Sequence, residues 1–435
     1  MKSRIVTAIC ALASTLSLAA TDLYWQGGTR SVISVAPQSA SGLDEVCVAD
    51  GLNGVSVSVT ASGSSDVKWY RYSNLGGAYA EEVAAVYSDG RSTLSNPQSD
   101  MGYIVETPAG RYSFWLIDYS AHPFSVASVA ESTEKDCNFT TLDVVGQGDE
   151  LVYYGINGRR FTLDREIQLS YTTLMPAQEE IAFIEVNREE TLPALNSPLR
   201  VSAPLCPTDF IIKGDRFLRA WGDEVEYTSP VIEPYAVATV TSATQSERNV
   251  ENEVSPSGGS GSLGGSAPCE VSFVAAVTDG ALFREWQISR YQDFEDVNLR
   301  IQELNFDYTF TEEGNIYVRF MCANADGSCE AYGDVYTISI GASSLRCPNA
   351  FSPNGDGVND EWRVSYSSIV SFECHIFDRY GHRMATLSDP SQGWDGKYNG
   401  KAVPTGAYYY VIKAKGADGK AYDLSGDINI VNYKQ

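Results

Sequence analysis

The sequence is poor in the residues that build most catalytic and metal centres. It has three histidines among 435 residues, and His122, His375 and His382 lie in dissimilar contexts. No two cysteines have the C-x-x-C spacing of a zinc site. A hydrolase triad needs a histidine placed between a serine and an acid, and no motif here indicates one. We therefore expect a non-catalytic protein without a cofactor, and a hidden hydrolase is a minor alternative.

Basic residues are also scarce. The chain has 31 Lys and Arg against 56 Asp and Glu, a formal net charge of −25. Residues 346–435 hold ten basic and ten acidic residues, so the acidic excess lies in front of them. An acidic chain repels nucleic acid and anionic lipid. We therefore exclude nucleic acid as a partner.

Long apolar runs are missing except at the start. Lys2 and Arg4 precede the weakly apolar run from Ile5 to Ala20, which ends in small residues. This pattern predicts a secretory signal peptide over residues 1–20, and so export through the inner membrane. No later run approaches the roughly 20 apolar residues that a spanning helix needs.

The eight cysteines outside this leader favour disulfides, because an even count in an exported chain is typical of paired thiols. Spacing alone leaves many pairings open. Our first candidate pair is Cys347 with Cys374, since both fall inside one expected domain. The next is Cys269 with either Cys322 or Cys329.

Helix signals are few, whereas strand signals recur along the whole chain. Aromatic residues are abundant, and short alternating runs are broken by Gly, Asn or Asp about every ten residues. In "GVSVSVTA", residues 54–61, the valines fall on one face and the serines on the other. The fold class predicted is all-β, with tandem immunoglobulin-like β-sandwich domains.

Changes in composition suggest where these domains begin and end. We expect β-sandwich domains over residues 21–136 and 137–245, with a poorly marked boundary between them, and a third domain over 269–343. Residues 246–268 are rich in Ser and Gly and predict a flexible linker or a long exposed loop. A last domain occupies 346–435.

The third domain has two family resemblances. Cys269, Trp286 and Cys322 follow one another in the order of the strand B cysteine, strand C tryptophan and strand F cysteine of immunoglobulin domains. The stretch "EEGNIYVRFMCANADGS", residues 312–328, is similar to the end of PKD-type domains. Both resemblances imply an extracellular spacer or binding module.

The stretch "FSPNGDGVNDEW", Phe351–Trp362, has the composition of a metal loop. Asn354, Asp356 and Asp360 could bind calcium near positions 3, 5 and 9 of a calcium loop. Its first and last positions would be a serine and an arginine, where such a loop needs an acid and a glutamate. The alternative is a turn in which two glycines supply positive φ and the Asn and Asp side chains cap backbone amides.

The same stretch opens an ordered series of motifs. "CPNAFSPNGDGVNDEW" is followed by "FECHIFDRYGHRM", "GWDGKYNGK", "VPTGAYYYVIKAKGADGK" and "LSGDINIV". The series closely resembles the gliding motility-associated C-terminal domain, the type B sorting domain of the Bacteroidota type IX secretion system. The positions that match the family pattern are Pro348, Asn349, Phe351, Pro353, Asn354, Gly355, Asp356, Gly357, Asn359, Asp360, Phe377, Arg379, Gly381, Trp394, Asp395, Gly396, Gly406, Tyr408, Tyr410 and Gly426.

This resemblance implies a β-sandwich sorting domain at the C-terminus and a role in export. Such domains dock on an outer-membrane β-barrel shuttle of the PorP/SprF type, and we expect the loop Asn354–Asp360 and the last strand to make the contact. The protein would then be associated with the outer membrane, at the cell surface or on its periplasmic face. The same resemblance implies other cell-envelope proteins or surface ligands as further partners. The alternative is a structural component of the secretion or gliding machinery, held at the periplasmic side.

Overall fold

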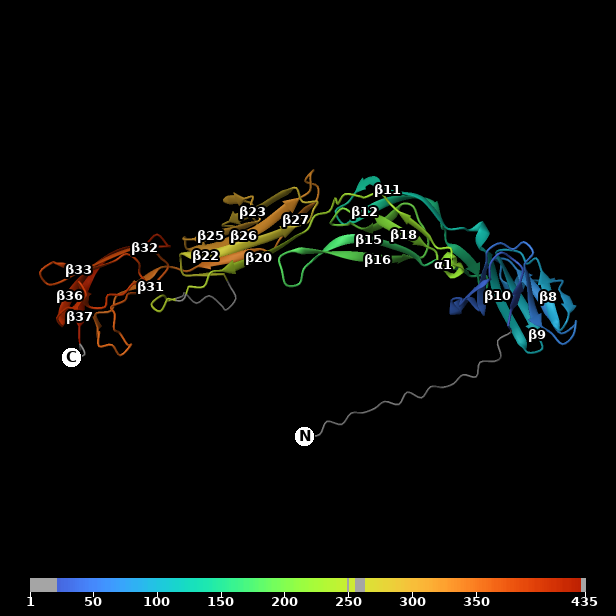
Figure 1. The fold of residues 1–435 in the computed structure, drawn as a ribbon, viewed down its shortest axis with the longest axis horizontal. Coiled ribbons are helices and arrows are strands. Elements are labelled where there is room, and N and C mark those ends of the chain that lie inside the picture. The colour runs from blue at the N-terminus through green and yellow to red at the C-terminus, as the bar shows by residue number, and fades with distance from the viewer. Residues whose placement is uncertain (1–21, 249, 255–262, 432–435) are drawn as a thin grey trace, which may run out of the picture.

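The computed structural model describes residues 22–248, 250–254 and 263–431, so the signal peptide expected at 1–20 lies outside them. Four β domains follow one another in a gently curved row, with domain 1 at one end and domain 4 at the other (Figure 1). The predicted all-β class is confirmed. In the described part of the chain, no helix is long and apolar enough to cross a bilayer.

Domain 1 is a sandwich of a four-stranded and a six-stranded sheet, antiparallel except where β3 pairs with β10. Three short 3-10 turns accompany it, at Ser39–Ser41, Gly77–Tyr79 and Tyr119–Ala121. The strands, in spatial order, are β1 (Tyr24–Gln26), β4 (Ser56–Thr60), β8 (Arg91–Ser95) and β7 (Val86–Ser88) in one sheet, and β2 (Ile33–Val35), β3 (Glu45–Ala49), β10 (Gly110–Asp118), β9 (Met101–Thr107), β5 (Lys68–Tyr72) and β6 (Glu81–Val83) in the other.

Domain 2 has a three-stranded sheet, a four-stranded sheet, a small hairpin and the helix α1 (Arg216–Trp221). The helix begins at Asp215, whose side chain accepts hydrogen bonds from two amides of the first turn. The strands are β11 (Ser125–Lys135), β12 (Phe139–Gln147) and β17 (Leu199–Ser202); β16 (Phe183–Leu192), β15 (Ile167–Pro176), β18 (Phe210–Gly214) and β19 (Val225–Thr228); and the hairpin β13 (Leu151–Tyr154) with β14 (Arg160–Leu163).

Domain 3 is a two-sheet sandwich around the fully buried Trp286, which packs against Phe273 and Phe320. The strands are β20 (Thr239–Gln245), β22 (Cys269–Val277) and β25 (Asn305–Phe310) in one sheet, and β21 (Leu263–Gly265), β28 (Tyr336–Ile340), β26 (Gly314–Ala323), β23 (Phe283–Ser289), β24 (Leu299–Ile301) and β27 (Glu330–Tyr332) in the other.

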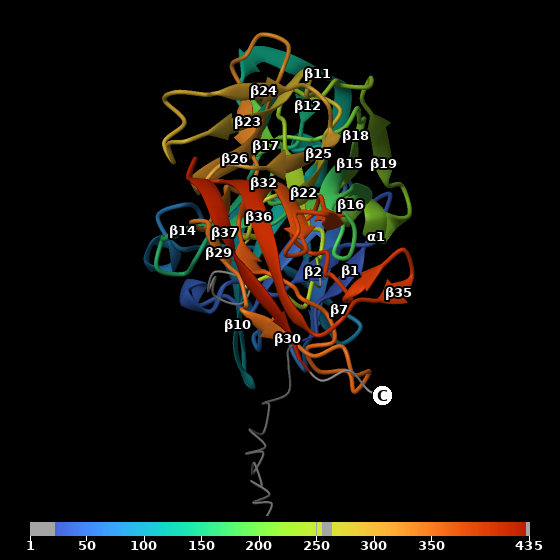
Figure 2. The same cartoon turned by 90° about the vertical axis from the view of Figure 1, so that its left-hand side faces the viewer.

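Domain 4 packs a five-stranded sheet against two short strand pairs and the loops between them. Figure 2 views the molecule from this end. The strands are β30 (Ala350–Phe351), β37 (Ala421–Ile430), β36 (Gly406–Gly416), β32 (Ile369–Phe377) and β33 (Arg383–Leu387) in the sheet, and β29 (Ser344–Arg346) with β31 (Ser365–Ser367) and β34 (Lys397–Tyr398) with β35 (Lys401–Ala402) outside it.

The domain boundaries differ from those that the sequence suggested. Strand β11, expected in the first domain, pairs with β12 of domain 2. Strand β20, expected in the second domain, pairs with β22 of domain 3. Both misplacements have one cause: no change in composition precedes either strand to mark a domain boundary.

The described residues of the expected linker, 246–248, 250–254 and 263–268, stand between β20 and β22 of domain 3, and 263–265 form β21. These residues bind domain 4. The Asn252 side chain donates to the carbonyl oxygens of Val364 and Pro390, both at 2.8 Å, and Ser266 Oγ accepts from the amide of Ser368 at 2.7 Å. These parts are therefore not a free linker, because they hold the junction between domains 3 and 4.

Domains 1 and 2 share a hydrophobic core. Along β10, Phe114 and Leu116 face the core inside domain 1, whereas Trp115 and Ile117 belong to the core shared with domain 2. One sheet of domain 1 is thus buried on both faces, which fixes domain 2 against it.

A buried ion pair lies next to this shared core. Arg165 Nη1 is 2.7 Å from Asp215 Oδ2, and both side chains are completely buried. The other guanidinium nitrogens donate to the carbonyl oxygens of His122 and Asp149, at 2.6 and 2.7 Å. Since His122 lies between domains 1 and 2, the pair fixes the connecting segment as well as α1.

Domains 2 and 3 are joined by a disulfide. Cys137 follows β11, Cys329 precedes β27, and their sequence separation is 192 residues. The proposed pairing of Cys269 with Cys329 is therefore wrong. Among the described residues the free thiols are Cys47, Cys206, Cys269, Cys322, Cys347 and Cys374, so the pairs Cys347–Cys374 and Cys269–Cys322 are not formed either. Cys269 and Cys322 instead lie buried as thiols within the core of domain 3.

Candidate docking site at the free end of domain 4

The strands of domain 4 have one end against domain 3 and one free end. At the covered end, the amide of Glu313 donates to the carbonyl oxygen of Ala417 at 3.1 Å, and Ser343 Oγ donates to Asp418 at 2.7 Å. Both acceptors follow the last residue of β36. The first residue of β36, Gly406, therefore lies at the opposite end of the domain.

Three motif segments lie at this free end: the loop after Phe351, the turn after Phe377 and the segment before Gly406. Gly406 pairs with Ile430, which in turn pairs with Phe351, so the loop after Phe351 begins here. Phe377 pairs with Tyr409, so the turn that follows Phe377 lies at the same end. The sheet thus brings together residues as far apart in the sequence as Phe351 and Ile430.

Several motif residues build the core beneath these segments. The Trp394 ring lies 5.6 Å from that of Phe351 and 5.2 Å from that of Tyr408, measured between centroids. The indole of Trp362, next to the motif, donates to the carbonyl oxygen of Pro348 at 2.7 Å, and its ring centroid lies 5.2 Å from that of Tyr410, with the two rings tilted. These aromatic residues have a structural role.

The glycines of the motifs occupy positions that other residues fit badly. Gly381 and Gly396 have φ of 85° and 71°, in the left-handed region. Gly426 is needed for space, since a Cβ atom there would lie 2.7 Å from the hydroxyl oxygen of Tyr410. The series of motifs therefore specifies turns and close packing at many of its positions.

The loop Asn354–Asp360 is closed by its own hydrogen bonds. The Asp360 carboxylate accepts from the amides of Gly355 and Gly357, at 2.6 and 2.8 Å, and both glycines have positive φ. Asn354 Oδ1 accepts from the amide of Asp356 at 3.0 Å. This geometry is that of the turn alternative. No group of three or more His, Cys, Asp or Glu residues within the described part of the chain could hold a metal ion, and calcium stays a prediction.

The turn after Phe377 is organised by Asp378. Its carboxylate accepts from the amides of Tyr380 and His382, both at 2.8 Å, and lies 2.9 Å from His382 Nδ1. Although desolvation opposes ionisation, the hydrogen bonds from His382 and Tyr380 lower the pKa of Asp378. Tyr380 is left 71% exposed at the surface, with the Arg379 guanidinium 4.9 Å from its ring centroid.

Two connected depressions lie beside this turn. One, of about 260 Å³, is lined by the 378–380 turn and by residues 404–408. The other, of about 600 Å³, is lined by Met384 and the segment 398–404, and both share Asp378, Pro404 and Tyr408. No nucleophile with a base and an acid lines them. The exposed side chain of Tyr380 and the hollow beside it can bind a partner, but they do not indicate a catalytic reaction.

The last strand, β37, has an open edge. It pairs with β36 along its whole length, but with β30 only at Asn429 and Ile430. The backbone from Ala421 to Ile428 therefore has no strand on its other side in the described part of the domain. Such an edge can accept an added strand from a partner. The neighbouring strand β36, by contrast, is an inner strand between β32 and β37.

The thiols of domain 4 do not provide a reactive centre. Cys374 is fully buried on β32, and burial raises its pKa to about 12, with a smaller contribution from Cys347 nearby. Burial also raises the pKa of Cys347. Since the thiolate is the reactive form, both side chains act as core residues.

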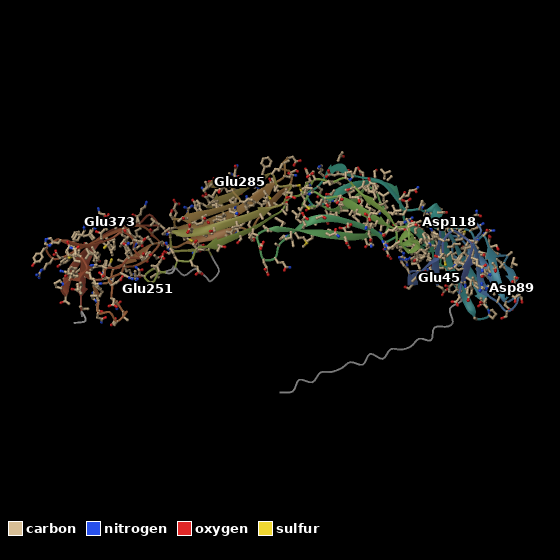
Figure 3. All side chains as sticks on the ribbon, in the orientation of Figure 1. Glu45, Asp89, Asp118, Glu251, Glu285 and Glu373 are labelled. Atoms are coloured by element: carbon tan, nitrogen blue, oxygen red, sulfur yellow. A yellow bond between two sulfur atoms is a disulfide. The ribbon has the colours of Figure 1, made fainter. Side chains whose placement is uncertain are left out.

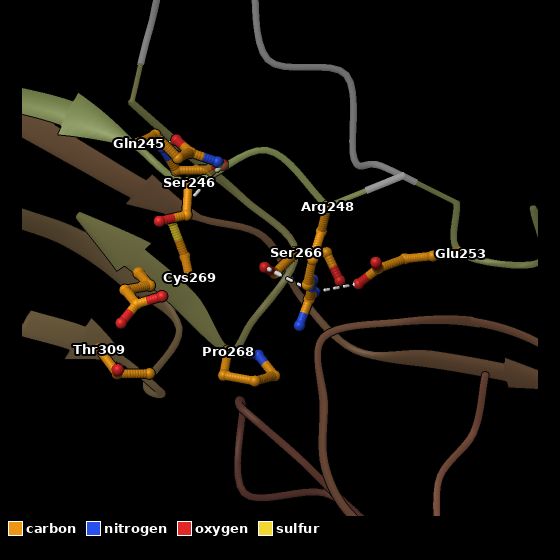
Figure 4. A pocket seen from close by; sticks show the side chains of 10 residues that line it. Gln245, Ser246, Arg248, Glu253, Ser266, Pro268, Cys269 and Thr309 are labelled. Carbon is orange, nitrogen blue, oxygen red and sulfur yellow. Dashed lines mark hydrogen bonds and ion pairs between the residues drawn. The ribbon is translucent and has the colours of Figure 1, made fainter. Parts of the chain in front are cut away.

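A further hollow lies in domain 3, on the side that faces domain 4 (Figure 4). It measures about 270 Å³, and an ion pair of Arg248 with Glu253 lies at its edge. Cys269 is its one thiol, and burial raises the pKa of this thiol. A raised pKa disfavours the reactive thiolate, so the hollow does not indicate a reactive cysteine.

Acidic side chains are spread along the molecule. Figure 3 labels Glu45 and Asp118 in domain 1, Glu285 in domain 3 and Glu373 in domain 4. Most of the ion pairs that they make are exposed. Arg160 and Glu150, 2.9 Å apart, are each about half exposed. A spread of this kind favours solubility and does not define a site.

Two family models match the chain. Residues 128–229 match a fibronectin type III domain, which is domain 2, and residues 345–429 match the CHU_C type IX secretion signal domain, which is domain 4. No curated protein matches.

Solved structures resemble the chain only in general terms. They include a tetra-tandem repeat in the extending region of a large adhesion protein (13% identity, 88% of this chain and 98% of that chain, TM-score 0.23) and immunoglobulin domains 1–5 of Sidekick-1 (10%, 86% and 75%, TM-score 0.24). Three N-terminal domains of the Hoc capsid protein of bacteriophage RB49 also match (11%, 71% and 99%, TM-score 0.22). These scores are too low to support any argument about function.

The family models confirm the resemblance seen in the sequence, and they imply export and an association with the cell surface or outer membrane. Domains of both kinds are typically non-catalytic. The chain thus carries a type IX secretion signal domain of the CHU_C family at its C-terminal end, behind a fibronectin type III domain.

Proposed function

We propose that the protein is a non-catalytic cargo of the type IX secretion system, delivered after cleavage of a signal peptide. Domain 4 docks on an outer-membrane β-barrel shuttle, and domains 1 to 3 form an acidic spacer or binding arm. The observation that carries the proposal is the position of three motif segments at the free end of domain 4. Since the opposite end is covered by domain 3, a partner reaches these segments without displacing the arm.

The docking surface can be tested by substitution in the source bacterium. We expect Tyr380→Ser to reduce the surface-exposed fraction of the full-length protein at least several-fold, because a large exposed aromatic residue is a typical hot spot of an interface. Tyr79→Ser is a matched control, since Tyr79 is 70% exposed at the other end of the molecule. Surface labelling and pull-down of the membrane barrel measure the effect. Equal export and equal barrel recovery for both variants would contradict the proposed docking site.

A second function is supported by the braced arrangement of the domains. A stiff row fixed at one end also suits a structural component of the secretion or gliding machinery on the periplasmic side. Protease treatment of intact cells separates the two functions. Cleavage of domains 1 to 3 on intact cells supports the surface arm, whereas cleavage only after lysis supports the machinery component.

A further inference from the structure

The junction between domains 2 and 3 has two covalent connections. The first is the peptide that runs from the last strand of domain 2 into β20. The second is the disulfide between Cys137 and Cys329. Cys137 lies two residues after β11, the first strand of domain 2, and Cys329 lies one residue before β27, near the end of domain 3. The disulfide therefore joins the beginning of one domain to the end of the next.

The position of the disulfide changes the shortest covalent path from domain 1 to domain 4. A path that leaves domain 1 enters β11, reaches Cys137 and crosses the disulfide to Cys329. It then continues through β27 and β28 into domain 4. All residues from 138 to 328, which form β12 to β26, lie on a closed loop beside this path.

From this path we infer that the protein is a load-bearing tether in which the disulfide keeps most of domains 2 and 3, the strands β12 to β26, free of tension. Pulling on domain 1 against an anchored domain 4 places the force on β11, the disulfide, β27 and β28. The strands on the closed loop cannot be extended while the bond is intact. At about 3.3–3.6 Å per residue, the 192-residue separation corresponds to roughly 65 nm of chain that cannot be extended while the bond is intact.

Noncovalent contacts hold the two cysteine-bearing segments together. The Tyr235 hydroxyl donates to Asp326 at 2.8 Å, and the Asn324 side chain donates to the carbonyl oxygen of Tyr235 at 3.2 Å. Lys135 lies 5.2 Å from the centroid of the Tyr235 ring. The connecting peptide thus packs beside the disulfide, so that one compact contact region transmits the force between the domains.

The source of the load rests on the proposed function, in which domain 4 is anchored and domain 1 is the free end. The covalent path itself exists in the purified chain, without any partner. Reduction by a dithiol opens the closed loop: the S–S bond breaks, both cysteines become thiols, and the dithiol is oxidised to its own disulfide. Residues 138–328 then enter the load path.

Single-molecule force spectroscopy on the purified chain, tethered at both ends, tests the inference. Without reductant, we expect a fully extended length of roughly 75 nm, since about 220 residues lie on the path. With dithiothreitol, we expect about 140 nm. The double variant Cys137→Ser/Cys329→Ser should reach the longer value under both conditions, and Cys347→Ser, which changes a half-buried free thiol, should behave like the unmodified chain.

Two results would overturn the inference. The first is an extended length of the unmodified chain that does not respond to the reductant. The second is a gain of only about 18 nm, which corresponds to a bond between Cys269 and Cys322. Mass spectrometry of an unreduced digest identifies the linked peptides independently of folding. Failure of export in cells would overturn the proposed function alone, because the pulling experiment needs neither the barrel nor the bacterium.

Discussion

At the residue scale, Asp326 is the most strongly perturbed carboxylate at the junction of domains 2 and 3. The hydroxyl and amide of Ser328 and the hydroxyl of Tyr235 donate to it, and they lower its pKa from 3.8 to about 2. The ionised form therefore stabilises the junction above about pH 4, and this contribution is lost as the pH falls through 2.

The pH dependence of the melting temperature checks this assignment. We expect Asp326→Asn to melt below the unmodified chain at pH 5, and the difference to shrink as the pH approaches about 2. Asp423→Asn, on the exposed face of β37, controls for the loss of an aspartate elsewhere. A difference of equal size at both pH values would show that ionisation of Asp326 has no part in the effect.

The loop Asn354–Asp360 allows a second prediction at this scale. Because both oxygens of Asp360 already accept backbone hydrogen bonds, we expect the same melting temperature in excess calcium and in chelator. Differential scanning calorimetry measures it. A rise with calcium that disappears in Asp360→Asn would instead assign a calcium ion to this loop.

The turn geometry of this loop can be predicted from the sequence, because Gly and Asx residues favour turns through local backbone chemistry. Gly355, Gly357 and Asp360 fulfil that expectation. The partner of Cys329 was not readable. The spacing of cysteines along the sequence does not show which residue of a neighbouring domain lies beside Cys329. Its partner, Cys137, belongs to the neighbouring domain 2.

At the scale of elements, the contact between α1 and the connecting segment depends on the ion pair of Arg165 with Asp215. We expect Arg165→Ala to cost about 3–5 kcal/mol, because it leaves a carboxylate buried without its partner. Arg160→Ala is the matched control, since its pair with Glu150 is exposed and should contribute less than about 1 kcal/mol.

Urea unfolding followed by tryptophan fluorescence measures both variants. Trp115 and Trp221 lie close to this junction and report on it. Equal losses of stability for Arg165→Ala and Arg160→Ala would contradict a special role of the buried pair.

The sequence contains a signal for the core that domains 1 and 2 share. The run "SFWLI" in β10 is apolar without alternation, which is typical of a strand covered on both faces. The membership of β20 in domain 3 had no comparable signal. The apolar and polar residues of β20 would alternate in the same way in either sheet. Only its pairing in the folded protein decides to which domain the strand belongs.

At the scale of the whole molecule, the row of domains is braced differently at each junction. A shared core and a buried ion pair join domains 1 and 2, a disulfide joins domains 2 and 3, and backbone and side-chain hydrogen bonds join domains 3 and 4. The sequence predicted the class of the last domain, which its family model confirms. It did not predict the contacts at the junctions, because the residues responsible are dispersed over neighbouring domains and form no local pattern.

The sheet of domain 1 that is buried on both faces also affects the order of folding. When domain 1 has been synthesised ahead of domain 2, its inner core can close, but Val46, Val48, Trp115 and Ile117 still face water. They are covered only after about 110 further residues have been added to the chain. During that interval the nascent chain exposes an apolar surface, which a chaperone is suited to shield.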